Sequence, residues 1–439
     1  MRAYMILLVL LLFIGDINSQ SRSFTLEEAI AYGLENHTEI RRGQLKILDA
    51  QQQIYQNRAI GLPTLEANFN YTRNLYLPVS LVPAQFIDDD AMEGEFAELQ
   101  FGTKNNMLGA LDLNTLLFDA NYLVALRASR KFKEFTEKEF EQIQTNVTNN
   151  IVDAYLPNLI IQENIQILSK NIDNLQNLYR ETSALYKGGF VEKLDVDRLE
   201  LSLSNLKAEM TNLEQRQVQT KLVLKYQMGL QANTEIEFSD NLENLLERYA
   251  NLRVHTDQLH LGRSEYRVSE LGVSLAELNV QSKKTAFLPS VRAFVNLQEI
   301  GQGDNLRSAI WNPTSAAGIS INVPIFSGLG KKADLERAKL DLEIQKIQQQ
   351  QLIDGINLEI TNAQNEVNTA LNNLAERNKN LVLAERIYRT TQIKYREGVG
   401  SSIEINQAEQ SLYQAQQNHL LAKYDLLKAR LDLNTALGI

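Results

Sequence analysis

The chain has 439 residues, of which 54 are acidic and 44 are basic, and it contains no cysteine. The acidic balance argues against a nucleic-acid-binding surface, which is more often basic. Without cysteine the chain can form no disulfide, thiolate metal site or thiol nucleophile, and it lacks the acceptor for lipid attachment at the amino terminus. We therefore expect neither a nucleic-acid partner nor a lipid anchor.

The first residues have the pattern of a secretory signal peptide. Arg2 supplies the positive charge, residues 6–14 are nearly all apolar, and Ser19 is a small residue before the expected cleavage point. A membrane-anchor helix is the alternative, but it needs about 20 apolar residues, roughly twice the length of this run. The sequence therefore predicts export, with a signal peptide over residues 1–19.

The rest of the chain is predicted to be mainly helical. Sustained apolar residues at alternating steps of three and four, such as Ile353, Ile356 and Ile360, are the signature of a coiled coil. Pro157 falls inside one long helix and predicts a kink or break there, because proline removes a backbone hydrogen bond. We place the helices at about 26–58, 119–185, 195–229, 257–286, 331–396 and 403–437.

Strands are predicted between the helices, near 64–74, 107–117, 291–298 and 319–325. Apolar and polar residues alternate along them, which is typical of a membrane barrel with lipid outside and water inside. A soluble sheet with one solvated face remains the alternative. The signal peptide and neighbouring aromatic residues favour the membrane; these aromatic residues are Tyr71, Tyr76 and Trp311.

These strands are too few to close a barrel within one chain. Spanning barrels have at least about eight strands, and an open edge in lipid is costly. If the strands span a membrane, the chain must oligomerise. Two copies would give a filled interior, whereas three or more would leave an open conduit.

The loop at 75–106 carries an acidic cluster that includes Asp88, Asp89 and Asp90. A solvated loop tip explains such a cluster, and bridging of divalent cations to anionic lipid is the functional alternative.

The helical part contains an internal repeat. Residues 185–203 align with residues 394–412 without a gap, so that Tyr186 meets Tyr395, Gly189 meets Gly398 and Asp195 meets Glu404. Two copies of one structural unit follow from such a repeat. We divide the mature chain into repeat 1 at 24–230, a linker at 231–256 and repeat 2 at 257–439.

The order of these elements resembles the TolC family of outer-membrane efflux and secretion channels. The supporting motifs are short, but they recur in order over about residues 24–439: Leu62-Pro63 and Leu288-Pro289 before strands, Val323-Pro324-Ile325-Phe326-Ser327-Gly328 after the last strand, and Tyr395-x-x-Gly398 with Ile403-Glu404-Ile405 at the second turn.

The resemblance implies a trimer with a twelve-stranded β-barrel in the outer membrane and a hollow α-barrel across the periplasm. It implies a passive exit duct for tripartite efflux or type I secretion, with no chemistry or cofactor of its own. Its partners would be a periplasmic adaptor, an inner-membrane transporter of the RND or ABC type, and outer-membrane lipid.

The resemblance also suggests where the channel closes. The glycine-bearing turns would form the periplasmic tip, where adaptors dock; their glycines are Gly188, Gly189, Gly398 and Gly400. By the same resemblance, Tyr395 and Asp195 would hold the tip shut, and three Glu404 side chains would form a carboxylate ring that favours cations. Acids at a helix start that interact with the helix dipole are the plainer reading of Asp195 and Glu404.

Two residues depart from the pattern of the family. Gly400 stands where the family has a gate arginine, and Gln407 stands where it has a second ring acid. Arg396, Lys193 or Arg198 could take the place of that arginine. The copies also differ where Lys193 aligns with Ser402, which marks this pair as a further candidate for the gate.

Other classes of protein fit less well. The four histidines are scattered, and no nucleophile triad, phosphate loop or metal-ligand spacing occurs, so we expect no enzyme, metal site or cofactor. A periplasmic coiled-coil scaffold or adaptor remains the alternative, although it would not need lipid-patterned strands. The sequence does not name the cargo.

Overall fold

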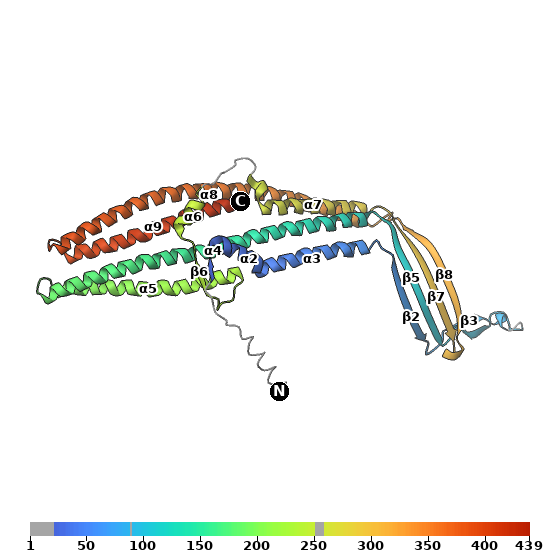
Figure 1. The fold of residues 1–439 in the computed structure, drawn as a ribbon. Coiled ribbons are helices and arrows are strands. Elements are labelled where there is room, and N and C mark those ends of the chain that lie inside the picture. The colour runs from blue at the N-terminus through green and yellow to red at the C-terminus, as the bar shows by residue number, and fades with distance from the viewer. Residues whose placement is uncertain (1–21, 88–89, 251–258) are drawn as a thin grey trace, which may run out of the picture. The chain divides into compact units, whose positions relative to one another are not determined.

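The computed structural model describes residues 22–87, 90–250 and 259–439. The predicted signal peptide lies outside these residues, as do 251–256 at the end of the predicted linker, and the division into repeats stays a prediction. The chain forms two compact units, and both appear in the ribbon of Figure 1. Of the described residues, unit 1 comprises 22–47, 135–250, 259–270 and 347–439, and unit 2 comprises 48–87, 90–134 and 271–346.

Two very long helices each lead through a turn into a shorter one, as predicted. The first hairpin consists of α4 (Ala120–Lys187) and α5 (Lys193–Met228), and the second of α8 (Gly330–Arg396) and α9 (Ser402–Leu437). The four predicted ranges for these helices are confirmed to within two residues at each end. The other helices are α2 (Leu26–Asn36), α3 (Thr38–Ala59), α6 (Leu242–Arg248) and α7 (Ser264–Thr285).

The single helix predicted at 26–58 is wrong, because the structure divides it at His37. The backbone of His37 is extended, with ψ of 136°, and its N–H bonds the carbonyl of Gly33 to end α2. Its side-chain Nδ1 then accepts a hydrogen bond of 3.2 Å from the N–H of Glu39, in the first turn of α3. One histidine thus ends one helix and caps the next, which helical periodicity does not reveal. The helix predicted at 257–286 also begins later, at Ser264, after a 3₁₀ turn at Leu259–Gly262.

The sequence predicts a kink or break at Pro157, and the break is wrong, since α4 continues through it. Proline removes the N–H that would bond the carbonyl of Asp153. The helix nevertheless persists because the side chains around the proline are fully buried; these are Tyr155, Leu156, Asn158 and Leu159. Tertiary packing here outweighs the local cost of proline.

The β part of the chain is a four-stranded antiparallel sheet in unit 2. Its order is β2 (Thr64–Arg73), β5 (Asn105–Asp119), β7 (Ser290–Gly303) and β8 (Ile310–Asn322). Four strands are present as predicted, and most are longer than the predicted ranges, but the last ends at Asn322, three residues before the end predicted for it. Within the described residues β2 and β8 each pair on one side only, so the sheet has two free edges.

The two faces of this sheet differ in polarity. Glu66, Asp112 and Asn296 are in register on one face, and the side chain of Asn68 donates to Asp112 at 3.3 Å. The opposite face carries aliphatic side chains in the next row, namely Leu65, Leu113, Val295 and Ala317. Many of the apolar side chains of the sheet are exposed in the single chain.

The sequence predicts a loop at 75–106, and the structure shows a β-hairpin within it. β3 (Val79–Pro83) pairs antiparallel with β4 (Phe96–Gln100). Of the predicted acidic cluster, Asp88 and Asp89 lie outside the described residues. Among the helices that the structure describes, none combines the length and apolar character required to cross a membrane.

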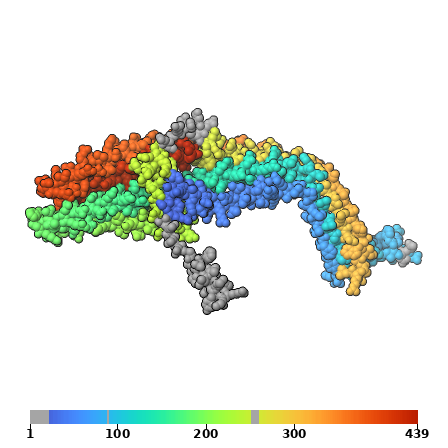
Figure 2. Space-filling view, in the orientation of Figure 1, coloured from blue at the N-terminus to red at the C-terminus, as the bar shows by residue number. Residues whose placement is uncertain are grey.

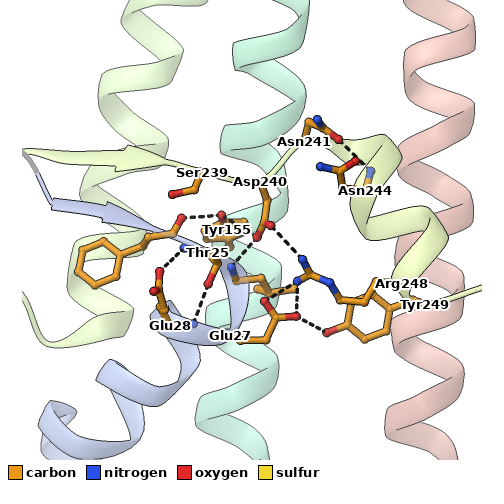
Figure 3. Close-up of polar contacts among 12 residues, drawn as sticks. Thr25, Glu27, Glu28, Tyr155, Ser239, Asp240, Asn241, Asn244, Arg248 and Tyr249 are labelled. Carbon is orange, nitrogen blue, oxygen red and sulfur yellow. Dashed lines mark hydrogen bonds and ion pairs between the residues drawn. The ribbon is translucent and has the colours of Figure 1, made fainter.

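The core of unit 1 is anchored by a short parallel pair of strands, which we call the clasp. β1 (Arg22–Phe24) pairs with β6 (Ile236–Phe238), so the start of the described chain is tied to the segment between the hairpins. Figure 3 shows the polar side chains around it. The Tyr155 hydroxyl lies 2.9 Å from the carbonyl oxygen of Phe24 and 3.2 Å from the carboxylate of Asp240.

Further bonds close the clasp on the side of α2. Asp240 accepts a hydrogen bond of 2.7 Å from the N–H of Leu26, and Arg248 donates to Glu27 at 2.6 Å. Burial, reinforced by the nearby charge of Asp240, raises the pKa of Tyr155 far above its usual range. Tyr155 therefore stays neutral and serves as a buried donor.

Replacing Tyr155 by phenylalanine should destabilise unit 1. The change keeps the ring but leaves Phe24 and Asp240 with one donor fewer in a buried site, at a cost of about 1–3 kcal/mol. We expect a lower midpoint of thermal unfolding in detergent. The matched control is Tyr249→Phe, because the Tyr249 hydroxyl bonds the exposed Glu27 at 3.3 Å from a side chain that is only partly buried. Equal shifts in the two variants would contradict the role given to Tyr155.

Candidate functional site: the turns of the helical hairpins

The two helical hairpins of unit 1 turn at the same end, as Figure 1 shows. In each turn one glycine has a left-handed backbone, with φ of 79° at Gly189 and 74° at Gly398. The hydrogen bonds also correspond, since Phe190 N–H bonds Leu185 O at 2.9 Å and Val399 N–H bonds Lys394 O at 3.0 Å. This is the αL glycine ending that stops a helix cleanly.

The other two predicted glycines act differently. Gly188 and Gly400 do not have a positive φ, but a Cβ on Gly400 would lie 3.0 Å from the backbone nitrogen of Tyr395. Beside the glycines, each turn exposes one large apolar side chain, Phe190 with 80% and Val399 with 77% of its surface accessible.

Below the turns the hairpins pack through a shared apolar cluster, which we call the seam. Figure 2 shows the hairpins as adjacent rods, α4–α5 in green and α8–α9 in orange to red. Each of the four helices contributes buried side chains to it: Leu175 and Leu178 of α4, Leu199 and Leu203 of α5, Ala384, Tyr388 and Tyr395 of α8, and Ile405, Ala408 and Leu412 of α9.

Tyr395 belongs to the seam and bridges the hairpins. Its hydroxyl lies 3.0 Å from Oγ1 of Thr182 on α4, and both side chains are buried. Burial raises the pKa of Tyr395, and the charge of Asp195 adds to that effect. The sequence does not predict the bond to Thr182, because a single threonine on a helix does not indicate which residue its hydroxyl will bond.

Asp195 is also joined to the second hairpin, through Ser402. The Ser402 hydroxyl donates to the Asp195 carboxylate, and Arg198 lies 3.7 Å from the same carboxylate and donates to Ser402 at 3.2 Å. Ser402 is the residue that aligns with Lys193, so the difference between the copies marks a contact. Bonds to a charged partner are stronger than neutral ones.

A second arginine crosses between the hairpins nearby. Arg396 pairs with Glu181 of α4 at 3.2 Å, with both side chains about half exposed. An exposed ion pair of this kind contributes less than about 1 kcal/mol. Lys193, Arg198 and Arg396 are the candidates to replace the family's gate arginine. Of these, Arg198 contacts Ser402 and Arg396 contacts Glu181, each on the other hairpin.

Glu404 lies in the first turn of α9 and is exposed. Its N–H donates to Oγ of Ser401, the N-cap, at 3.2 Å. Its position fits a helix-start acid, whereas a carboxylate ring would require further copies of the chain. Gln407 is exposed one turn further along α9.

No group of three or more metal-ligating side chains occurs among the described residues. The contacts at the turns instead link one hairpin to the other, so the arrangement can hold or release the hairpins.

Replacing Ser402 by alanine should loosen both hairpins near the turns. It removes the donor to Asp195, and we expect amide hydrogen exchange to become up to about tenfold faster in the first turns of α5 and α9. Ser401→Ala is the control, because Ser401 caps α9 alone. If Ser402→Ala speeds exchange in α9 but leaves exchange in α5 unchanged, the link to α5 is refuted.

Comparison with known proteins agrees with this architecture. A family model described as "Outer membrane efflux protein" matches residues 30–230 and 256–439. The cation efflux system protein CusC of Escherichia coli O157:H7 is 22% identical over 426 residues, covering 93% of this chain and 85% of its own. The pyoverdine export outer membrane protein OpmQ of Pseudomonas putida is 22% identical over 312 residues, covering 68% and 63%.

Solved structures show the same fold. A CusC crystal structure superposes with a TM-score of 0.76 at 18% identity, covering 97% of this chain and 95% of the other. The outer membrane protein VceC of Vibrio cholerae gives a TM-score of 0.72 at 16% identity, covering 94% and 96%. The predicted fold class, a duplicated TolC-like chain that is mainly helical with a β part, is confirmed. With most of its length matched by the family model, the chain belongs to the outer membrane efflux protein family.

Proposed function

We propose that three copies of this chain form an outer-membrane channel, a passive exit duct for tripartite efflux or type I secretion. The observation that carries the proposal is the four-stranded sheet with one aliphatic and one polar face and two free edges. In lipid those edges must be paired, because unbonded backbone groups cost several kcal/mol each. Three copies would supply twelve strands, enough for a barrel with an open lumen.

The helical unit supports the same proposal. The relatives are outer-membrane efflux proteins, and the paired hairpins of unit 1 would form one third of a periplasmic α-barrel. We place the glycine turns at the periplasmic tip, where Phe190 and Val399 offer exposed apolar contacts to an adaptor. An inner-membrane RND or ABC transporter would supply the energy. Relatives are named for cation efflux and for pyoverdine export, so we assign cargo choice to that transporter.

The proposal predicts channel activity from the purified protein alone. Detergent-extracted protein should run as a trimer in light scattering and give discrete conductance steps in a planar bilayer. A periplasmic coiled-coil scaffold, the alternative, would leave isolated membranes with salt or carbonate and give no conductance. Release without detergent would overturn the channel proposal.

The proposed carboxylate ring of Glu404 predicts block by multivalent cations. Glu404→Gln removes one charge per copy, and we expect a clear loss of block by di- and trivalent cations from the side of the turns. Glu397→Gln is the control, because Glu397 lies in the turn that precedes α9 and outside the proposed ring. Unchanged block in Glu404→Gln would remove Glu404 from the pore.

A further inference from the structure

One buried acid in the seam has no role in the contacts described above. Glu409 lies on α9 between the seam residues Ala408 and Leu412, and only 6% of its surface is accessible. Its Oε1 atom is fully buried and has no hydrogen-bond partner among the described residues. The aligned residue of the first copy, Glu200, is exposed on α5. The duplication therefore placed an acid at both positions, but only the second copy buries it.

The surroundings of Glu409 offer little to a negative charge. To the seam α4 and α5 contribute buried leucines and the partly buried Tyr179, and α8 contributes Ala384, Tyr388 and Tyr395. Burial raises the pKa of Tyr388 to about 12, and the charge of Glu409 adds to this. Arg396 and Glu181 also act on Tyr388, but they pair with each other.

An ionised carboxylate in such a site is unfavourable, because it has lost its water and gains no paired cation from the part of the chain that the structure describes. Burial raises the pKa of Glu409 to about 8. Near neutral pH the packed seam therefore favours the protonated side chain. Ionisation favours an arrangement in which α9 moves away and water reaches the carboxylate.

We propose that Glu409 is a proton-sensitive latch, which holds the hairpins together at the seam when protonated and loosens α9 from α4 and α5 when it ionises. The biological role of this latch rests on the proposed channel function, in which opening of the seam would widen the periplasmic tip. The contacts through Thr182, Ser402 and Glu181 would limit how far the hairpins separate.

The direction of the pH effect follows from linkage. The packed state binds the proton more tightly than the loosened state, in which the carboxyl titrates near its ordinary value. The stabilisation is thus complete below that ordinary value and is lost as pH rises through about 8. Over that range the ratio of packed to loosened subunits should fall by up to about tenfold per pH unit.

The absence of cysteine makes a direct distance measurement possible. Spin labels would be placed on Phe190→Cys and Val399→Cys, at the two turns. The labelled chain would be mixed with an excess of the cysteine-free chain, so that each assembly carries one pair. Double electron–electron resonance should then show a longer distance population that grows from pH 5.5 to pH 9.

Glu409→Gln in the labelled and unlabelled chains should hold the shorter distance at every pH, whereas the control Glu200→Gln should respond as the parent does. The same pH response in Glu409→Gln as in the parent, or none in the parent, would overturn the latch. If Glu409→Gln fails to fold, the infrared band of a protonated carboxylic acid at neutral pH tests the parent directly. Its absence would also overturn the latch.

Failure of the latch and failure of the channel proposal can be told apart. A protein that conducts in planar bilayers but shows no pH response at the turns loses only the latch. A protein that forms no channel loses the proposed function, while the distance measurement still decides whether Glu409 controls the seam.

Discussion

Burial of one apolar stripe from each helical hairpin is the constraint on which the arrangement of the turns depends. The seam joins leucines of α4 and α5 to alanines, tyrosines and leucines of α8 and α9. Apolar burial is non-directional, and it can be undone over a short length without breaking the long helices. Such a seam can fix the hairpins side by side and still allow their ends to separate.

The polar groups that border the seam supply the directional contacts between the hairpins. Tyr395 with Thr182, and Ser402 with Asp195, each join one hairpin to the other through a specific pair of atoms. Buried hydrogen bonds of this kind contribute modestly when made and cost more when left unmade. The turns are therefore held in one arrangement by a few bonds, each of which a single substitution can remove.

The sheet of unit 2 imposes a different constraint. Its strands pair with one another inside the chain, but β2 and β8 each keep one edge that no described residue pairs. A free edge with an aliphatic face is an assembly surface in lipid and an aggregation hazard in water. The clasp of β1 and β6 is paired instead, with Phe24, Ile236 and Phe238 buried, which suits a part of the chain whose task is to hold unit 1 together.

The sequence by itself determined the helices, the strands and the duplication, because these follow from periodicity and from glycine at the turns. It also marked Tyr395, Asp195 and the difference between Lys193 and Ser402. It failed at His37 and Pro157, where a side-chain cap and a buried surrounding override local preference. Only the tertiary structure decided that Thr182 meets Tyr395 and that Glu409 is buried while Glu200 is exposed. The two glutamates align in sequence but differ in burial. That difference arises from packing between helices, which the identity of a single residue does not determine.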